Sequence, residues 1–467
     1  MTEKASDSEA FSFYLPCDNN CAILETVSKE ADRMKKSVYP SRFWPALIIF
    51  SLVGQIAWVV ENMYFNVFLY KMFNAGASAI STMVAASAVS AALTTIVIGA
   101  LSDKLGRRRV FICGGYVLWG LTIAAFALLR VDLIGAAFPT AVSVSAVAIT
   151  LVIVLDCVMT FFGSAANDAA FNAWLTDVTA GGGRGAAEGV NAMMPLLAIL
   201  VVFGGFMAFD LDKQESWTMI FLIIGAVVLV IGVLGFFLIR ESGVRQEENN
   251  KYFRNIVYGF RLSVVRKTPL FYLTLAAFAV FSISIQIFMP YLILYYNVSL
   301  GMENYVLIMA PAILIAAVVT AAYGRVYDKV GFLRAIVPSL AMLCSGYIVL
   351  YCFRQTALVF VGSLLMMCGY LTGMAVFGAM LRDRTPEGKA GMFQGLRIVA
   401  QVLIPGVIGP AIGAAVLSNA EMALNSDGTY SFIPNQNIFL AALVAIVCLL
   451  PLLWVLVRRE RKEENAS

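Results

Sequence analysis

Histidine is absent from this 467-residue chain, and charged residues are scarce. Only 13% of the residues are Asp, Glu, Lys or Arg, against 60% hydrophobic residues and a mean hydropathy of +0.83. Soluble domains carry about 25% charged residues, so this chain could not cover its own surface in water. The lack of histidine also excludes His-based metal sites and the Ser-His and Cys-His pairs of nucleophilic catalysis. We therefore expect no enzyme, no metal and no cofactor.

Cysteine adds little to the chemistry. Six of the eight cysteines lie in apolar runs, where a free thiol packs as a small hydrophobic group: Cys113, Cys157, Cys344, Cys352, Cys368 and Cys448. Cys17 and Cys21 lie in the polar N-terminal segment with no further ligand nearby, so a metal or redox role for this pair is the lesser alternative.

The chain contains twelve long apolar stretches. A membrane-spanning helix needs about 20 apolar residues, and the polar segment before the first stretch predicts no cleavable signal peptide. The twelve stretches cover residues 44–70, 78–101, 110–130, 147–174, 186–208, 217–240, 270–296, 304–323, 335–353, 357–381, 391–417 and 437–457. The chain is predicted to be an all-α polytopic membrane protein with twelve transmembrane helices.

Polar segments divide the chain into two halves and two tails. The expected divisions are an N-terminal tail 1–43, a six-helix half 44–240, a central loop 241–269, a six-helix half 270–457 and a C-terminal tail 458–467. With both tails in the cytoplasm, 28 of the 33 Lys and Arg residues fall on the inner side. The outer side keeps Lys71, Arg130, Lys213 and Arg354, and Arg397 lies within a span. The positive-inside rule thus predicts a multi-pass protein of the cell (plasma) membrane with cytoplasmic tails and central loop.

Two sequence patterns recur between the halves. Gly99, Asp103, Lys104, Gly106 and Arg109 reappear 225 positions later as Gly324, Asp328, Lys329, Gly331 and Arg334. A second block, Leu175, Asp177, Thr179, Gly182, Gly185 and Gly189, reappears 206 positions later as Leu381, Asp383, Thr385, Gly388, Gly391 and Gly395. The patterns predict two pseudo-symmetric six-helix halves in one orientation, the parallel repeat of one large transporter class.

The first of these patterns resembles the signature of the major facilitator superfamily. Gly99-Ala-Leu-Ser-Asp103-Lys-Leu-Gly106-Arg107-Arg108-Arg109 matches that family's motif between spans 2 and 3, and the weaker copy follows span 8. The resemblance implies alternating access, a monomer, and a cytoplasmic latch that holds the outward-facing state. The residues carried over to the latch are Gly99, Asp103, Gly106, Arg107, Arg109, Asp328 and Arg334.

A narrower resemblance lies at the end of span 4. Asn167-Asp168-Ala-Ala-Phe171-Asn-Ala-Trp174-Leu175-Thr-Asp177 is similar to the glycoside–pentoside–hexuronide cation symporters and the related sucrose-type carriers. Those proteins bind a cation with an acidic residue on helix 4, which implies such a role for Asp168. The chain departs from the melibiose-carrier pattern because span 2, residues 78–101, has no acidic residue.

Polar residues in span 1 form a stripe at helical spacing. Glu61 lies about 15 Å from the outer end of the span at 1.5 Å per residue, near the midplane where such carriers place their sites. It is a candidate coupling carboxylate, and a structural Glu paired between helices is the alternative. The candidate substrate-binding residues of the stripe are Gln55, Trp58, Asn62 and Asn66.

Span 4 carries two further acidic residues, Asp156 and Asp168, which are candidates for cation coupling, with Asn167 as a substrate ligand. An α-helix separates residues twelve apart by about 18 Å along the axis and about 120° around it. We therefore expect that the two aspartates do not form one carboxylate pair, and structural pairing of either is the alternative.

The second half offers candidate substrate ligands as well. Gln286 lies 225 positions after Glu61, and Tyr291 follows it in span 7. Arg397 and Gln401 share a face of span 11. Arg397 could bind an anionic substrate group, pair with Asp168 or Glu188, or extend to the membrane interface.

These features predict a secondary active transporter. No nucleotide-binding P-loop is present, so ATP is not its direct energy source. The interpretation is cation-coupled uptake of a sugar or glycoside with a proton or sodium ion, without a nucleic-acid partner. The alternatives are a proton-coupled exporter of drug-like or other small organic molecules, and a transporter-like sensor that binds without transport.

Overall fold

The computed structural model describes residues 42–179, 184–241, 261–385, 395–424 and 429–464. Twelve helices in these ranges are long and apolar enough to cross a membrane, and each overlaps one predicted stretch. The all-α class with twelve spans is thereby confirmed. Residues 1–41 with Cys17 and Cys21, most of the central loop, and 465–467 lie outside the described residues.

The first six spans are built from α-helices interrupted by short π- and 3₁₀-helical segments. Their elements are α2 (Phe43–Val59), η1 (Val60–Tyr64), α3 (Phe65–Phe73), α4 (Ala77–Leu105), α5 (Arg108–Ala125), η2 (Phe126–Leu128), α6 (Val131–Ala137), α7 (Val144–Gly163), η3 (Ser164–Phe171), α8 (Asn172–Val178), α9 (Arg184–Phe206) and α10 (Gln214–Leu238).

The last six spans follow the same plan and add a small hairpin. Their elements are α12 (Leu262–Lys267), α13 (Pro269–Phe288), η5 (Met289–Tyr291), α14 (Leu292–Leu294), η6 (Tyr295–Ser299), α15 (Val306–Cys352), α16 (Thr356–Asp383), η7 (Val399–Leu403), α18 (Ile404–Val416), η8 (Leu417–Asn419), β1 (Met422–Leu424), β2 (Tyr430–Phe432) and α19 (Asn437–Glu464). The two strands pair antiparallel, with Ala423 opposite Ser431.

Two glycines turn the chain at corresponding places in the halves. Gly106 ends α4 with φ +63°, and Gly331 interrupts α15 with φ +75°. Both values lie in the left-handed region that favours glycine. The element α15 contains two spans, 306–324 and 329–352, and Gly331 lies near the start of the second. The pair occupies equivalent positions of the 225-residue repeat, so the repeat in the sequence corresponds to a repeated turn in the structure.

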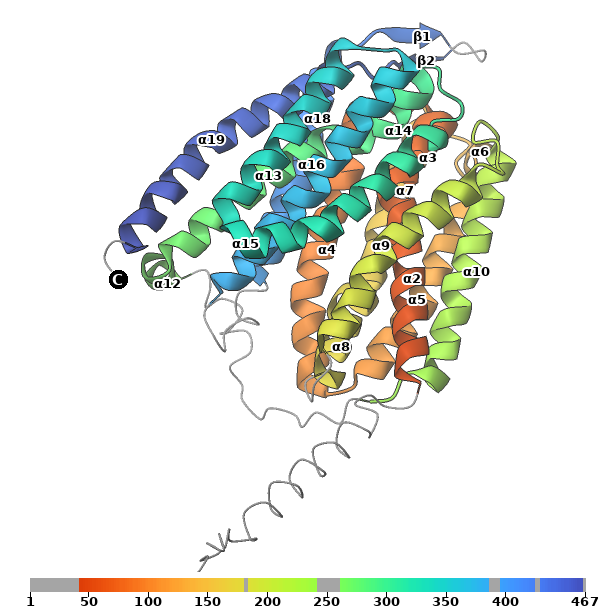
Figure 1. Ribbon diagram of the computed structural model, residues 1–467. Helices are drawn as coiled ribbons and strands as arrows, with labels where there is room; N and C mark the ends of the chain where they lie inside the picture. The colour runs from red at the N-terminus through yellow and green to blue at the C-terminus, as the bar shows by residue number, and fades with distance from the viewer. Residues whose placement is uncertain (1–41, 180–183, 242–260, 386–394, 425–428, 465–467) are drawn as a thin grey trace, which may run out of the picture.

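The halves meet along α4 and α18, and also along α9 and α15. Small residues allow the close approach, because a Cβ on Gly406 of α18 would lie 2.5 Å from the Cβ of Ala88 on α4. In Figure 1 the helices of the halves converge at the end that carries β1 and β2 and diverge toward the opposite end.

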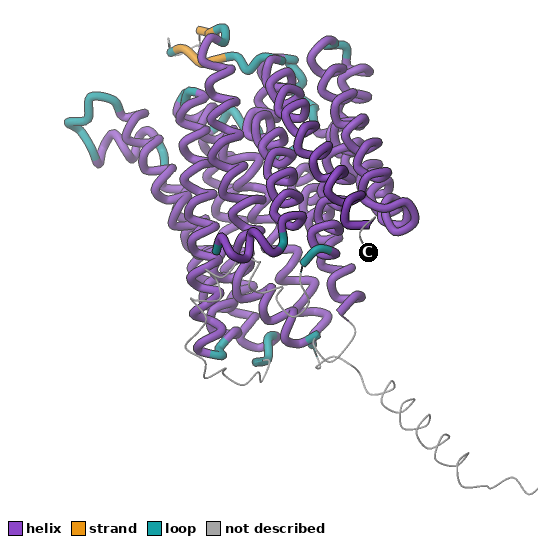
Figure 2. Tube along the Cα trace, turned by 90° about the vertical axis from the view of Figure 1, so that its left-hand side faces the viewer, coloured by secondary structure: helices purple, strands orange, loops and turns teal. Residues whose placement is uncertain are grey.

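Side-chain hydrogen bonds between described residues join the halves at the hairpin end, which Figure 2 shows at its top. They run from Tyr70 to the Phe432 carbonyl (2.6 Å), from Asn74 to Thr429 (2.8 Å), from Ser431 to Asn74 (3.1 Å), from Tyr291 to the Ala77 carbonyl (3.1 Å) and from Tyr305 to Tyr64 (3.1 Å). Because Asn74 sits at φ +52° after α3, its side chain is presented directly to the hairpin. The two halves are thus fastened together at this end.

The opposite end carries bonds within each half. In the first half Arg108 Nε lies 3.1 Å from Asp177 Oδ2 and its Nη1 donates to Ser102 Oγ at 2.6 Å. In the second half Arg384 pairs with Glu460 at 2.7 Å. Each of these bonds joins two residues of the same half.

Candidate functional site

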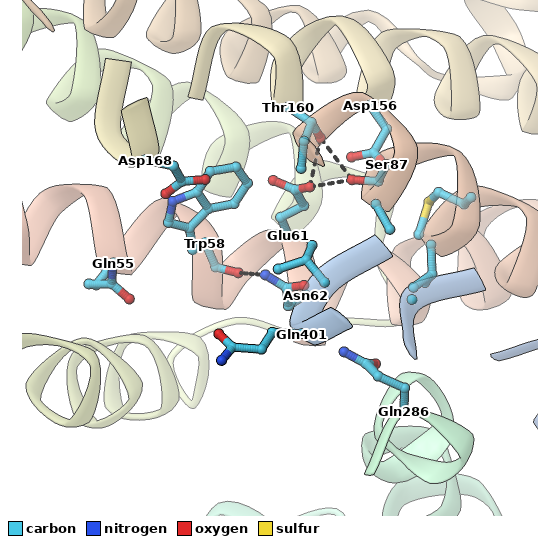
Figure 3. A pocket seen from close by; sticks show the side chains of 16 residues that line it. Gln55, Trp58, Glu61, Asn62, Ser87, Asp156, Thr160, Asp168, Gln286 and Gln401 are labelled. Carbon is cyan, nitrogen blue, oxygen red and sulfur yellow. Dashed lines mark hydrogen bonds between the residues drawn. The ribbon is translucent and has the colours of Figure 1, made fainter. Parts of the chain in front are cut away.

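A cavity of about 350 Å³ lies between the two halves (Figure 3). Its walls come from α2, η1, α4, α7 and η3 on one side, and from α13, η7 and α18 on the other. The lining residues are Gln55, Trp58, Glu61, Asn62, Met83, Val84, Ser87, Ala88, Ala91, Asp156, Thr160, Asp168, Gln286, Gln401, Val402 and Gly406. The first half supplies every acidic group, and the second half supplies two neutral amides.

Four polar residues of the cavity lie in π-helical segments: Glu61 and Asn62 in η1, Asp168 in η3 and Gln401 in η7. A π-helical turn holds one more residue than an α-turn, because its hydrogen bonds run from i to i+5. It therefore rotates the following side chains relative to an unbroken α-helix. Such insertions are frequent at functional sites.

Glu61 is buried and held by two hydroxyl groups. Ser87 Oγ donates to Glu61 Oε1 at 2.7 Å, and Thr160 Oγ1 donates to the same oxygen at 2.8 Å. The two hydroxyl oxygens are themselves 2.8 Å apart. Glu61 Oε2 has no hydrogen-bond partner among the described residues, although the side chain is only 6% exposed. One carboxylate oxygen is satisfied and the other is open to a ligand or a proton.

Asp156 is the second buried acid, 1% exposed, and its Oδ1 also lacks a partner within the described part of the chain. It lies one helical turn from Thr160 on α7, close enough for its charge to interact with that of Glu61. Isolated charges of this kind are expensive to bury, at about 2.5–3.5 kcal/mol each near the middle of a spanning helix. The pair therefore calls for a positive charge nearby or for a proton on one of the two carboxylates.

Asp168 lies at the other end of the acidic wall, beside the indole of Trp58 and toward Gln55 (Figure 3). It is half-buried, so the cavity reaches its carboxylate. Asn167 Nδ2 donates to Asp168 Oδ1 at 3.3 Å, and Asn167 Oδ1 in turn accepts from Tyr116 at 2.9 Å. These neighbours orient Asp168 without neutralising it.

The two aspartates of span 4 face one cavity, which differs from the rotation of about 120° that an unbroken α-helix would give. The cause is η3, which begins at Ser164 and adds residues to the turn that leads to Asp168. Asp156 and Asp168 still form no carboxylate pair, as expected, since they occupy different ends of the wall.

Four of the residues predicted to bind substrate lie outside the cavity lining. Asn66 is 1% exposed and donates to the Asn62 carbonyl at 3.1 Å, while Asn167 bonds Tyr116 and Asp168 behind the wall. Tyr291 is fully buried and donates to backbone carbonyls of Ala77 and Pro410. These three make packing or positioning contacts in this conformation.

Arg397 is the fourth residue outside the lining. It forms no ion pair with Asp168, and its buried Nε has no hydrogen-bond partner within the described ranges. The side chain of its other predicted partner, Glu188, lies outside the described residues. The structure therefore brings Gln55, Trp58, Glu61, Asn62, Asp156, Asp168, Gln286 and Gln401 together, and leaves Arg397 one turn away from Gln401.

The residues assigned to the latch lie at the end opposite the hairpin. Gly99 and Gly106 belong to the last turns of α4, Arg107 and Arg334 are exposed, and Arg109 binds the Phe236 carbonyl. The side chains of Asp103 and Asp328 lie outside the description. Sequence reasoning missed Arg108, whose signal was the repeated Asp177 that it pairs with. It also missed Ser87, because hydroxyl residues are frequent in apolar spans and carry no distinctive spacing.

Comparisons with known proteins agree with this architecture. The family model of the Major Facilitator Superfamily matches residues 43–410. This chain belongs to the major facilitator superfamily, and it is a membrane transporter, not an enzyme.

Solved transporter structures share the fold at low sequence identity. The nucleoside transporter NupG is 12% identical, with a TM-score of 0.65 over 87% of this chain and 97% of NupG. A bacterial homolog of the human lysosomal transporter Spinster, inward-facing and occupied, is 16% identical, with a TM-score of 0.65 over 91% of this chain and 98% of the homolog. The xylose transporter XylE from E. coli, inward open and partially occluded, is 14% identical, with a TM-score of 0.62 over 88% of this chain and 98% of XylE. No curated protein matches the sequence.

Proposed function

We propose that this protein is a proton-coupled secondary transporter that takes up a small hydroxylated molecule of the sugar or glycoside type by alternating access. The observation that carries the proposal is the cavity between the halves, in which a buried acidic pair meets neutral amide side chains. A transported solute must contact both halves, because their relative movement exposes it to one side and then the other. The lining satisfies this requirement.

The coupling step is assigned to Glu61 and Asp156. Each keeps one buried carboxylate oxygen without a donor, and the hydroxyls of Ser87 and Thr160 already occupy Glu61 Oε1. A proton bound by either carboxylate removes one buried charge from the pair. Sodium prefers a shell of several oxygens around it, and it remains the alternative that the experiment below tests.

The substrate subsite is assigned to the opposite walls. Gln286 and Gln401 project from the second half toward Asn62 and Gln55 of the first (Figure 3). An amide donates through its nitrogen and accepts through its oxygen, so a set of amides suits hydroxyl groups, which do both. Trp58 provides a flat apolar face beside them. Among the structural neighbours are transporters named for xylose and for nucleosides, which fits this class of solute.

The hydrogen bonds that join described side chains of the two halves lie at the hairpin end, and this supports an inward-facing state. With the topology that the basic residues predict, the hairpin end faces outside and the loop between α4 and α5 faces the cytoplasm. The cell membrane is the location we propose, and the monomer is the functional unit.

Uptake into proteoliposomes tests the proposal. Purified protein is reconstituted and given a panel of labelled sugars and nucleosides, with an imposed proton gradient, an imposed sodium gradient, or neither. Accumulation that requires the proton gradient supports the proposal. Accumulation driven by sodium alone contradicts the proton assignment, and binding without accumulation under any gradient contradicts transport.

A further inference from the structure

We infer that the substrate carries a protonated amine and that Asp168, beside the face of Trp58, binds this ammonium group. The inference rests on the proposed function and narrows its substrate class, from hydroxylated molecules in general to hydroxylated amines such as amino sugars or aminonucleosides. It follows from how the charges of the cavity are divided, as set out below.

The cavity contains two acidic sites that differ in access. Glu61 and Asp156 are 6% and 1% exposed and pack against hydroxyl groups, so they have room for a proton. Asp168 is half-buried and its carboxylate borders the cavity. Asp168 is therefore the more exposed of the three cavity carboxylates and the one that a substituted ammonium group can contact most readily.

No positive side chain neutralises Asp168. None of the cavity-lining residues is Lys or Arg, and the side chain that hydrogen-bonds to the Asp168 carboxylate within the described ranges is the neutral amide of Asn167. Arg397 is near in sequence to the cavity residue Gln401 but does not line the cavity. A carboxylate that stays ionised in this apolar setting needs a counter-charge, and since no described side chain supplies one, we assign it to a ligand in the cavity.

The surroundings of Asp168 favour an organic cation over a bare metal ion. The aromatic face of Trp58 attracts a cation through its quadrupole, most strongly where water is excluded. No cluster of three acidic or cysteine ligands that could hold a metal occurs among the described residues. Gln55 lies on the same side (Figure 3), where its amide oxygen can accept a second ammonium hydrogen.

The size of the cavity limits the rest of the molecule. A volume of about 350 Å³ lies at the lower end of the range for small-molecule pockets, which is about 300–1,000 Å³. With the ammonium at Asp168, the remainder of the ligand extends toward Gln286 and Gln401 on the opposite wall, where hydroxyl groups find partners. The charge of Asp168 also interacts with that of Glu61. A cation bound at Asp168 therefore changes how strongly Glu61 holds a proton.

Matched ligand pairs test the inference on the purified full-length protein in detergent. Thermal unfolding is followed with glucosamine against N-acetylglucosamine, and with 3′-amino-3′-deoxyadenosine against adenosine, at a pH below the pKa of the amines and in a potassium buffer. Each pair differs in the charged nitrogen. We expect the amine of at least one pair to bind about 10- to 100-fold more tightly than its neutral partner, the range for a charge-assisted hydrogen bond in a partly dry site.

Variants test whether the preference for the amine depends on Asp168. Asp168→Asn should lose the difference in affinity between the paired ligands, whereas Asp168→Glu should retain part of it. The melting temperatures of both variants without ligand are compared with wild type to exclude misfolding. Asp132→Asn, which removes an exposed carboxylate paired with Arg130 outside the cavity, should retain all of it. Equal affinities within every pair, including no binding by any ligand, overturn the inference, as does an amine preference that survives in Asp168→Asn. Proton-driven uptake of neutral sugars alongside equal affinities would overturn the inference and leave the proposed function standing.

Discussion

At the scale of single residues, glycines that lack a side chain help to place the acidic side of the cavity, which is formed by Glu61, Asp156 and Asp168. A Cβ on Gly54 would lie 2.5 Å from Tyr116 Oη and 2.6 Å from Asn167 Oδ1. A Cβ on Gly115 of α5 would lie 2.6 Å from the Cβ of Ala166 in η3. These two glycines allow α2 and α5 to pack closely around η3, and η3 carries Asp168.

Replacement of Gly115 tests this packing. Gly115→Ala should lower the stability of the protein by about 1–3 kcal/mol, the usual cost of inserting a methyl group into a filled core. Gly114→Ala is the matched control in the same helix, because its Cβ would have no neighbour within 4 Å. It should leave stability unchanged or raise it by up to about 1 kcal/mol, since alanine favours a helix more than glycine does. Melting temperatures in detergent measure both, and equal effects at the two positions would refute the close contact.

At the scale of elements, the hairpin β1–β2 acts as a strap from the second half onto the first. Asn74 is the centre of the contact, donating to Thr429 and accepting from Ser431. The strap must open whenever the outer end opens, so its hydrogen bonds help to set the balance between the two states. A net contribution of about 0.5–1.5 kcal/mol per bond is enough to change that balance severalfold.

Asn74→Gly isolates the strap, because glycine keeps the left-handed backbone at the end of α3 and removes only the side chain. We expect faster amide hydrogen exchange in β1, β2 and the end of α3, and a larger outward-open population. Asp210→Asn is the control, since its ion pair with Lys213 is exposed and lies within the first half. If the exchange of the strap does not change in Asn74→Gly, the strap does not hold the closed end.

The elements also show what the sequence could predict and what it could not. Hydropathy located all twelve spans, because the bilayer imposes one length and one composition on each. Their α-helical spacing predicted that Gln55, Trp58, Glu61 and Asn62 share one face of span 1. Four polar cavity residues, Glu61, Asn62, Asp168 and Gln401, occupy π-helical segments, which no spacing rule marks, so α-helical spacing alone could not give the direction of Asp168.

The sequence also could not predict contacts between helices that are far apart in the chain. Ser87 became visible only where α4 brings it to Glu61, and the burial of Tyr291 follows from its bonds to α4 and α18. The roles assigned to the cavity residues stay predictions, because the geometry places them together without showing a bound substrate.

At the scale of the whole molecule, the basic residues and the closed hairpin end make a joint prediction of topology. Residue 104 should face the cytoplasm and residue 140 the outside. In a background without native cysteines, Thr140→Cys should react with a membrane-impermeant maleimide on intact cells. Lys104→Cys should react only after the membrane is made permeable. Both side chains are exposed, so reaction of the two in the opposite order would reverse the proposed orientation.

Alternating access also connects the acidic pair to energy use. When the pair is protonated, one buried charge disappears and the loaded carrier can change state. When it is empty of both proton and substrate, two ionised carboxylates lie near each other in a low dielectric and the change is unfavourable. In the proposed function the proton gradient therefore acts through these carboxylates, while exchange of substrate on both sides needs no net proton movement.

The most direct test of the account is Glu61→Gln in proteoliposomes that support proton-driven uptake with the wild-type chain. Glutamine keeps the shape and can still accept from Ser87 and Thr160, but it cannot release a proton. We predict that exchange of labelled for unlabelled substrate continues at a rate within a few-fold of wild type, while accumulation driven by the proton gradient is abolished. Accumulation that persists in Glu61→Gln would contradict the account and leave Glu61 with a structural role.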